Sequence, residues 1–109
     1  MTEDTAGKNW KLNLRYGRLK TPFQHFTLIA DGIAGELVDG VACRAGPAVM
    51  SMKAWATDTD ESADMFVAIG RQIGFTVTGK ICIYETAPEQ PPEQNPHGYA
   101  IHFVAHDGN

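Results

Sequence analysis

Acidic side chains cluster in residues 55–66, WATDTDESADMF, where four carboxylates fall within seven positions. The four are Asp58, Asp60, Glu61 and Asp64. Clustered carboxylates bind divalent cations or exchange protons with a substrate. A calcium-binding loop of the EF-hand type that began at Asp58 would need glycine at its sixth position and glutamate at its twelfth. Those positions hold Ala63 and Ile69, so the spacing excludes this kind of metal site.

The same residues suit the beginning of a helix. Asp58 is placed to accept hydrogen bonds from the free amides of the first turn, and Glu61 is placed to reach back as in a capping box. Gly74 suits the left-handed position that ends a helix, with an apolar residue following it. We therefore predict a helix over about 59–73, with the two remaining acids turned to solvent and no metal bound.

Histidine and cysteine are the other residue types that suggest metal binding or catalysis. His102 and His106 lie four residues apart, which on a strand separates them by roughly 13 Å and prevents them from sharing a metal. Cys43 and Cys82 form no C-x-x-C pair, and no common nucleotide-binding or hydrolase motif is present. The sequence therefore predicts no metal and no cofactor. The remaining histidines are His25 and His97.

One constellation with catalytic chemistry depends on strand pairing. If residues 76–86 and 98–106 form a hairpin with their isoleucines on one face, Cys82, Tyr84 and His102 share the opposite face. A thiol, a phenol and an imidazole together can bind a small polar ligand or act as acid and base. No carboxylate is placed to orient His102, so a mixed, solvent-exposed strand face is the preferred interpretation.

Composition describes an ordinary globular chain of 109 residues, 43% hydrophobic and 20% charged, with a net charge of −4. This length fits a single domain over 1–109, with residues 1–8 flexible. The negative charge argues against nucleic acid or an anionic membrane as a partner. No apolar run approaches the ~20 residues of a membrane span. The absence of a basic-then-apolar leader predicts a cytoplasmic, bacterial-type protein.

Hydrophobic periodicity places these residues on the elements of an α+β fold. The expected order is ββ(β)βαββ, a two-layer sandwich in which one helix covers one face of a curved, mostly antiparallel sheet of about five or six strands. The second strand is expected to be bent or bulged near Gly32. Residues 87–98 are rich in proline, which favours a stiff connection and offers a second contact surface. The expected strands are 10–16, 23–34, 48–57, 75–86 and 99–106, with an irregular loop or brief edge strand over 35–47.

Alternation divides the strand 48–57 into two different faces. One face carries alanines and methionines suited to lie beneath a helix, and the other carries Val49 and Trp55. Together with Tyr84 and Val104, these residues make the second face too apolar for an uncovered sheet. We expect a second subunit, a ligand or a curled N-terminal hairpin to cover it. A homodimer through this face, or through an open edge strand, is the leading expectation.

Two segments, MSMKAWATDTDESADM and IGFTVTGKICIYETAPEQPP, are similar to a family of small bacterial proteins found as orphan genes on mobile cassettes. The resemblance covers roughly the second half of the chain. It supplies no functional residues, since no activity is established for such proteins. It implies a short accessory protein rather than a housekeeping enzyme.

The sequence thus favours a non-catalytic accessory protein that binds a protein or a small ligand, as a homodimer. Two alternatives stay open. One is a small enzyme that uses the face with Cys82, Tyr84 and His102. The other is an immunity-type inhibitor that blocks a basic toxin surface with its acidic half. The acids that would contribute to such a surface are Asp60, Asp64, Glu89 and Glu93.

Overall fold

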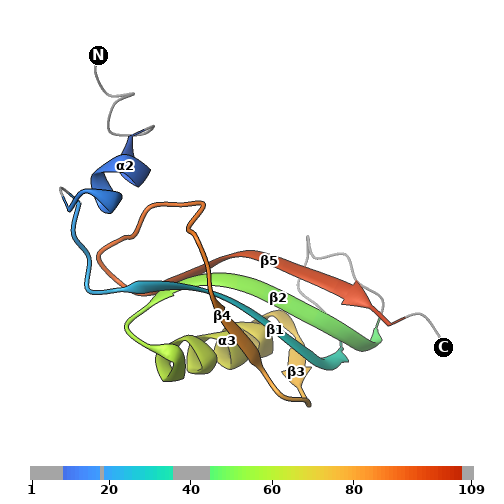
Figure 1. The fold of residues 1–109 in the computed structure, drawn as a ribbon. Coiled ribbons are helices and arrows are strands. Elements are labelled where there is room, and N and C mark those ends of the chain that lie inside the picture. The colour runs from blue at the N-terminus through green and yellow to red at the C-terminus, as the bar shows by residue number, and fades with distance from the viewer. Residues whose placement is uncertain (1–8, 18, 36–44, 107–109) are drawn as a thin grey trace.

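A computed structural model describes residues 9–17, 19–35 and 45–106 as a five-stranded sheet with one long helix packed against it (Figure 1). The predicted α+β architecture is confirmed. Residues 1–8, Cys43 and most of the expected loop over 35–47 lie outside the described residues. The elements are α2 (Trp10–Arg15), β1 (Gln24–Ala34), β2 (Gly46–Ala56), α3 (Thr59–Ile73), β3 (Phe75–Val77), β4 (Cys82–Glu85) and β5 (His97–Ala105).

The centre of the sheet is the antiparallel pair β1 and β2, which stay in register from Gln24 opposite Ala56 to Ala34 opposite Gly46. β5 lies antiparallel beside β2. β3 and β4 both lie antiparallel beside β1, one after the other along its length. The strand order is therefore β3 and β4, then β1, β2 and β5.

The core lies between this sheet and α3. The predicted inward face of β2 is confirmed, because its three alanines and two methionines between Ala48 and Ala56 are all inaccessible to solvent. Phe66 projects from α3 onto this surface and is fully buried, while Met65 and Ile69 pack around it. Small side chains on the sheet let the helix approach closely, and the larger ones fill the remaining space.

Both ends of α3 are fixed by local hydrogen bonds. The Asp58 side chain, at the N-cap, accepts a hydrogen bond from the amide of Glu61 at 2.8 Å. The Glu61 carboxylate in turn accepts from the amide and hydroxyl of Thr57, at 2.7 and 2.8 Å. At the other end Gly74 has a φ of 119°, and its amide donates to the carbonyl of Gly70. This left-handed residue directs the chain back towards the sheet, where Phe75 is buried.

The expected first strand over 10–16 is wrong, because the structure has the helix α2 there. Trp10, Asn13 and Leu14 are its partly buried residues, and their spacing follows the period of a helix rather than the alternation of a strand. No neighbouring strand is hydrogen-bonded to this segment within the described residues. α2 instead projects from one end of the sheet (Figure 1). The observed order is αββαβββ.

Two further local predictions need correction. The expected strand 75–86 is divided into β3 and β4, because the amides of Thr78 and Gly79 both donate to the carbonyl of Asp31 and leave the regular ladder. The expected bulge near Gly32 is absent, since that residue keeps its register opposite Ala48. Its missing side chain instead gives room to β3. A Cβ at this position would lie far inside contact distance of the Phe75 ring and the Thr76 carbonyl.

Candidate functional site

The structure does not bring together the thiol, phenol and imidazole considered for catalysis. β4 pairs with β1 and β5 pairs with β2, so the hairpin between residues 76–86 and 98–106 does not form. Cys82 and His102 occupy one row across the sheet with Ile29 and Ser51 between them. Three strand spacings separate them by about 14 Å. Tyr84 lies on the same distant strand as Cys82, so the geometric condition for a shared acid–base site is not met.

The four acids of an inhibitory surface also lie apart. Asp60 and Asp64 are exposed on α3, which covers one face of the sheet. Glu89 and Glu93 are exposed in the proline-rich segment, which covers part of the opposite face. Within the described residues, no group of three metal-ligating side chains is close enough to hold an ion.

Trp55, the aromatic residue expected to need a cover, is 3% exposed and is covered by the chain itself. Its indole Nε1 donates a hydrogen bond to the carbonyl of Gln90 at 2.8 Å. The ring of His25 meets the indole edge-on, with centroids 5.1 Å apart. The proline-rich segment therefore folds back over this end of the sheet instead of leaving the indole free for a partner.

A buried hydrogen-bond network holds that segment in place. The hydroxyl of Tyr99 accepts from the amides of Glu89 and Gln90, at 3.0 and 3.3 Å. The same hydroxyl lies 2.5 Å from Nε2 of His25. On its other side, Nδ1 of His25 lies 3.0 Å from the carbonyl of Thr86. One imidazole therefore links Thr86, the residue that follows β4, with Tyr99 of β5.

The partners of His25 determine its proton arrangement. A carbonyl oxygen can only accept, so Nδ1 carries the proton and donates to Thr86. Tyr99 already accepts from two amides, so its hydroxyl donates to Nε2. This arrangement requires a neutral imidazole. Burial lowers the pKa of His25 from its ordinary 6.5, and nearby Lys53 acts in the same direction.

Beside this network His97 is less completely satisfied. Its side chain is 18% exposed, but both ring nitrogens are buried and find no hydrogen-bond partner among the described residues. The nearest carboxylate oxygen, on Glu93, is 3.9 Å from Nε2. The ring stacks at a tilt on Tyr99, with centroids 5.9 Å apart. His97 therefore packs as an aromatic ring at the edge of the network.

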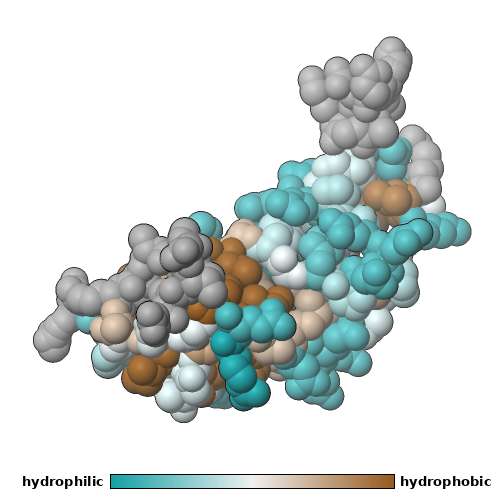
Figure 2. Space-filling model, turned by 180° about the vertical axis from the view of Figure 1, so that it is seen from behind, coloured by the Kyte–Doolittle hydropathy of each residue, from teal (hydrophilic) through white to brown (hydrophobic). Residues whose placement is uncertain are grey.

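Elsewhere on this sheet face, several of the described apolar side chains are accessible to solvent. Val104 on β5 is 65% exposed and Tyr84 on β4 is 56% exposed. Ile29 and Ile33 on β1 are also exposed. Val49 on β2, the strand between β1 and β5, is half-buried. Hydrophobic surface gathers on the half of the molecule away from α2, whereas the surface near α2 is largely polar (Figure 2). Of the four residues expected at an interface, Val49, Tyr84 and Val104 thus remain accessible and Trp55 does not.

β5 forms one margin of the described sheet and has a free edge. The amide of His106 donates to the carbonyl of Pro47, so by alternation Val104 and His102 also direct their polar backbone groups toward β2. Phe103 and Ala105 then direct theirs outward. The strand contains no proline and no Asp, Glu, Lys or Arg, which are the residues that commonly protect such an edge.

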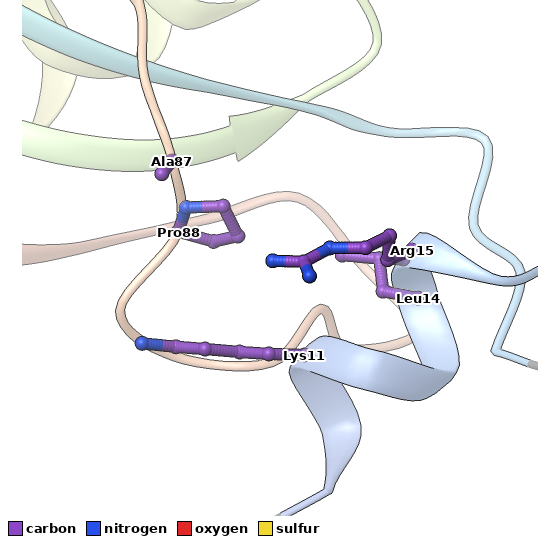
Figure 3. A pocket seen from close by; sticks show the side chains of 5 residues that line it. All are labelled: Lys11, Leu14, Arg15, Ala87 and Pro88. Carbon is purple, nitrogen blue, oxygen red and sulfur yellow. The ribbon is translucent and has the colours of Figure 1, made fainter.

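A second feature that the sequence did not reveal lies at the other end of the molecule. α2 and the proline-rich segment enclose a cavity of about 350 Å³, lined by Lys11, Leu14, Arg15, Ala87 and Pro88 (Figure 3). A neighbouring cavity of about 500 Å³ shares Leu14 and reaches Trp55. A strand interpretation of residues 10–16 hides this site, because it places Leu14 opposite Lys11 and Arg15. On a helix all three project to one side.

Comparison with protein-family models, curated proteins and solved structures found no match to this chain. Within the described residues, no helix combines the length and apolar character needed to cross a bilayer. The fold and the surfaces therefore carry the functional argument. Within the described residues these are an α+β fold, an exposed apolar area on one sheet face, an unpaired outer edge at β5, and cavities beside the projecting helix α2.

Proposed function

We propose that this protein is a non-catalytic binding protein that acts as a homodimer. The observation that carries the proposal is the exposed apolar surface that runs across the sheet to the free edge of β5. Val104, the most exposed of its large hydrophobic side chains, stands on that edge strand itself. An exposed patch of this kind beside an unprotected edge is a typical protein interaction site.

A two-fold arrangement of two β5 strands satisfies the geometry of this edge. Antiparallel pairing centred on Phe103 sets the outward backbone groups of Phe103 against their own copies, and those of Ala105 against Ile101 of the second copy. The pairing makes one continuous sheet from two chains. On its open face Val104 lies beside His102 of the second copy, so part of its apolar surface leaves water. Such self-complementary contacts are typical of two-fold dimers.

The arrangement leaves Ile29, Ile33 and Tyr84 outside the pairing of the two β5 strands. A continuous sheet displays two sets of these side chains on one face. This enlarged apolar face is the surface that we assign to a further protein partner. The proposed activity is therefore assembly, with the sheet as the binding surface and no chemical step.

The experiment measures the molar mass of the purified protein by light scattering during gel filtration, over micromolar concentrations. We expect a dimer, and we expect Ala105→Pro to convert it to a monomer, because proline removes an outward amide and leaves the β2 ladder intact. Val104→Lys should act in the same way by placing a charge beside the edge. Circular dichroism must show that both variants stay folded.

Ile33→Lys is the matched control, since it adds the same charge to the same face two strands away. It should leave the dimer unchanged if β5 pairs. A wild-type monomer at all concentrations would contradict the proposal. Dissociation by Ile33→Lys but not by Ala105→Pro would instead assign the dimer to the open face.

A further inference from the structure

The cavity beside α2 is built from two walls of different chemistry. One wall is a single face of α2, on which Lys11, Leu14 and Arg15 are spaced at i, i+3 and i+4. The other wall is the stretch of chain that contains Ala87 and Pro88, at the start of the proline-rich segment. Both cationic side chains extend from the helix toward this second wall (Figure 3). Positive charge and apolar surface therefore line the same cavity.

The second wall is held rigidly. Gln90, two residues beyond Pro88, accepts a hydrogen bond from the Trp55 indole and donates its amide to Tyr99. The amide of Glu89 donates to the same hydroxyl. Thr86, on the near side, is bonded to His25. A wall fixed at both ends need not be ordered by a ligand, which lowers the entropic cost of binding.

The two cations of the first wall have no acidic partner among the described residues. Within the described residues, ion pairs are found only at histidines, and Lys11 has only the Trp10 ring beneath its ammonium group, at 5.6 Å. Like charges four residues apart on a helix repel one another. An anion between them relieves this repulsion and gains charge-assisted hydrogen bonds, which the arginine fork makes in pairs to a carboxylate.

The apolar part of the site continues away from these charges. Leu14 is shared with the larger neighbouring cavity. Its lining combines the apolar side chains of Leu19, Phe23 and Trp55 with the polar side chains of Lys20, Thr21, Gln24 and Glu85. Each cavity is within the size range of small-molecule sites. A ligand with a charged head and an apolar body therefore meets matching surfaces in sequence: first the two cations, then Leu14, then the aromatic side chains.

We propose that this cavity binds a small carboxylate ligand with an apolar body. Its carboxylate lies between Lys11 and Arg15, and its apolar body extends along Leu14 toward Trp55. This site does not involve the outer edge of β5, so it does not depend on the proposed dimer. A monomeric protein would therefore leave this inference standing.

The test is isothermal titration calorimetry of the full chain with octanoate, with octylamine as the probe of equal length and opposite charge. We expect octanoate to bind at least tenfold more tightly than octylamine, and more tightly than butyrate, which has the same head and a shorter body. Arg15→Gln and Lys11→Gln should each weaken octanoate binding about tenfold. The matched control is Arg71→Gln, which removes an exposed cation from α3 and should leave the affinity unchanged.

Two further variants test the parts of the site separately. Leu14→Ser should remove the preference for octanoate over butyrate while both still bind, because it alters only the apolar part. Glu89→Gln should strengthen binding, since it removes a negative charge next to Pro88 that repels the carboxylate of the ligand. α2 lies outside the core, so circular dichroism should show all these variants folded. Equal affinity for octanoate and octylamine, or an Arg15→Gln variant that binds as tightly as the wild type, would overturn the proposal.

Discussion

The hydroxyl of Tyr99 lies 2.5 Å from Nε2 of His25, and 74 residues of chain separate the two side chains. The contact joins β5 to the start of β1 across the end of β2. Because the same hydroxyl accepts the amides of Glu89 and Gln90, it also anchors the segment that covers Trp55. The shape of this end of the molecule therefore depends on one buried phenol.

Replacement of Tyr99 by phenylalanine should destabilise the protein by about 1–3 kcal/mol, because an imidazole and two amides lose their common partner. The proline-rich segment should loosen, so acrylamide should quench tryptophan fluorescence more strongly than in the wild type. Urea unfolding measures the loss of stability. Tyr84→Phe is the control, since that side chain is exposed, and it should change the stability by less than about 0.5 kcal/mol. Equal effects of the two substitutions would contradict the assigned anchoring role.

His25 should make the stability depend on pH. Its folded-state pKa lies below the ordinary 6.5, because burial disfavours the imidazolium, an effect that Lys53 and His97 reinforce and the Thr86 carbonyl and Glu89 oppose. As the pH falls below 6.5, His25 becomes protonated in the unfolded chain while it stays neutral in the folded chain. The free energy of unfolding should therefore decrease with falling pH until the folded-state pKa is passed.

Urea unfolding of the wild type and of His25→Gln, each at about pH 7.5 and about pH 5.5, measures this contribution. The wild type should lose more stability than the variant over this interval. All other ionisable groups are the same in the two proteins, so their contributions cancel in the comparison. The same loss in both would show that His25 contributes nothing to the pH dependence.

Asp58→Ala should lower the free energy of unfolding by about 1 kcal/mol, because the first turn of α3 loses its N-cap acceptor. For a domain of this size this corresponds to a fall of about 4–8 °C in Tm. Asp64→Ala removes an exposed acid from the same helix and serves as the control. A smaller fall for Asp58→Ala than for Asp64→Ala would contradict the capping role.

Gly32→Ala should be the most damaging of these substitutions, with a loss of about 3 kcal/mol or more, because the new methyl group meets the Phe75 ring and the Thr76 carbonyl. Relief of this clash requires β3 to move away from β1. Gly79→Ala is the matched control, since its new methyl group first meets Asp31 Cβ at 3.4 Å, an ordinary contact. Thermal unfolding followed by circular dichroism separates the two cases, and similar Tm values would refute the close-approach role of Gly32.

The local sequence determined those features whose causes lie within a few residues. α3 begins at Asp58 because this side chain accepts a hydrogen bond from the amide of Glu61, three residues away. It ends at Gly74 because glycine readily adopts the left-handed conformation. The two faces of β2 follow from strand alternation, because the alanines and methionines share one face and Trp55 lies on the other. The α+β class follows from these elements together.

Features that depend on distant partners were decided only by the tertiary structure. Apolar and polar residues alternate in residues 10–16, but this pattern alone does not make a strand. Within the described residues no strand pairs with this segment, which forms α2. β4 pairs with β1 rather than β5, and this choice separates Cys82 from His102. Strand order is set by long-range burial and hydrogen bonding, which local periodicity does not encode. The same long-range contacts bring Gln90 over Trp55 and place α2 beside Pro88, and so create the cavity that we assign to a carboxylate ligand.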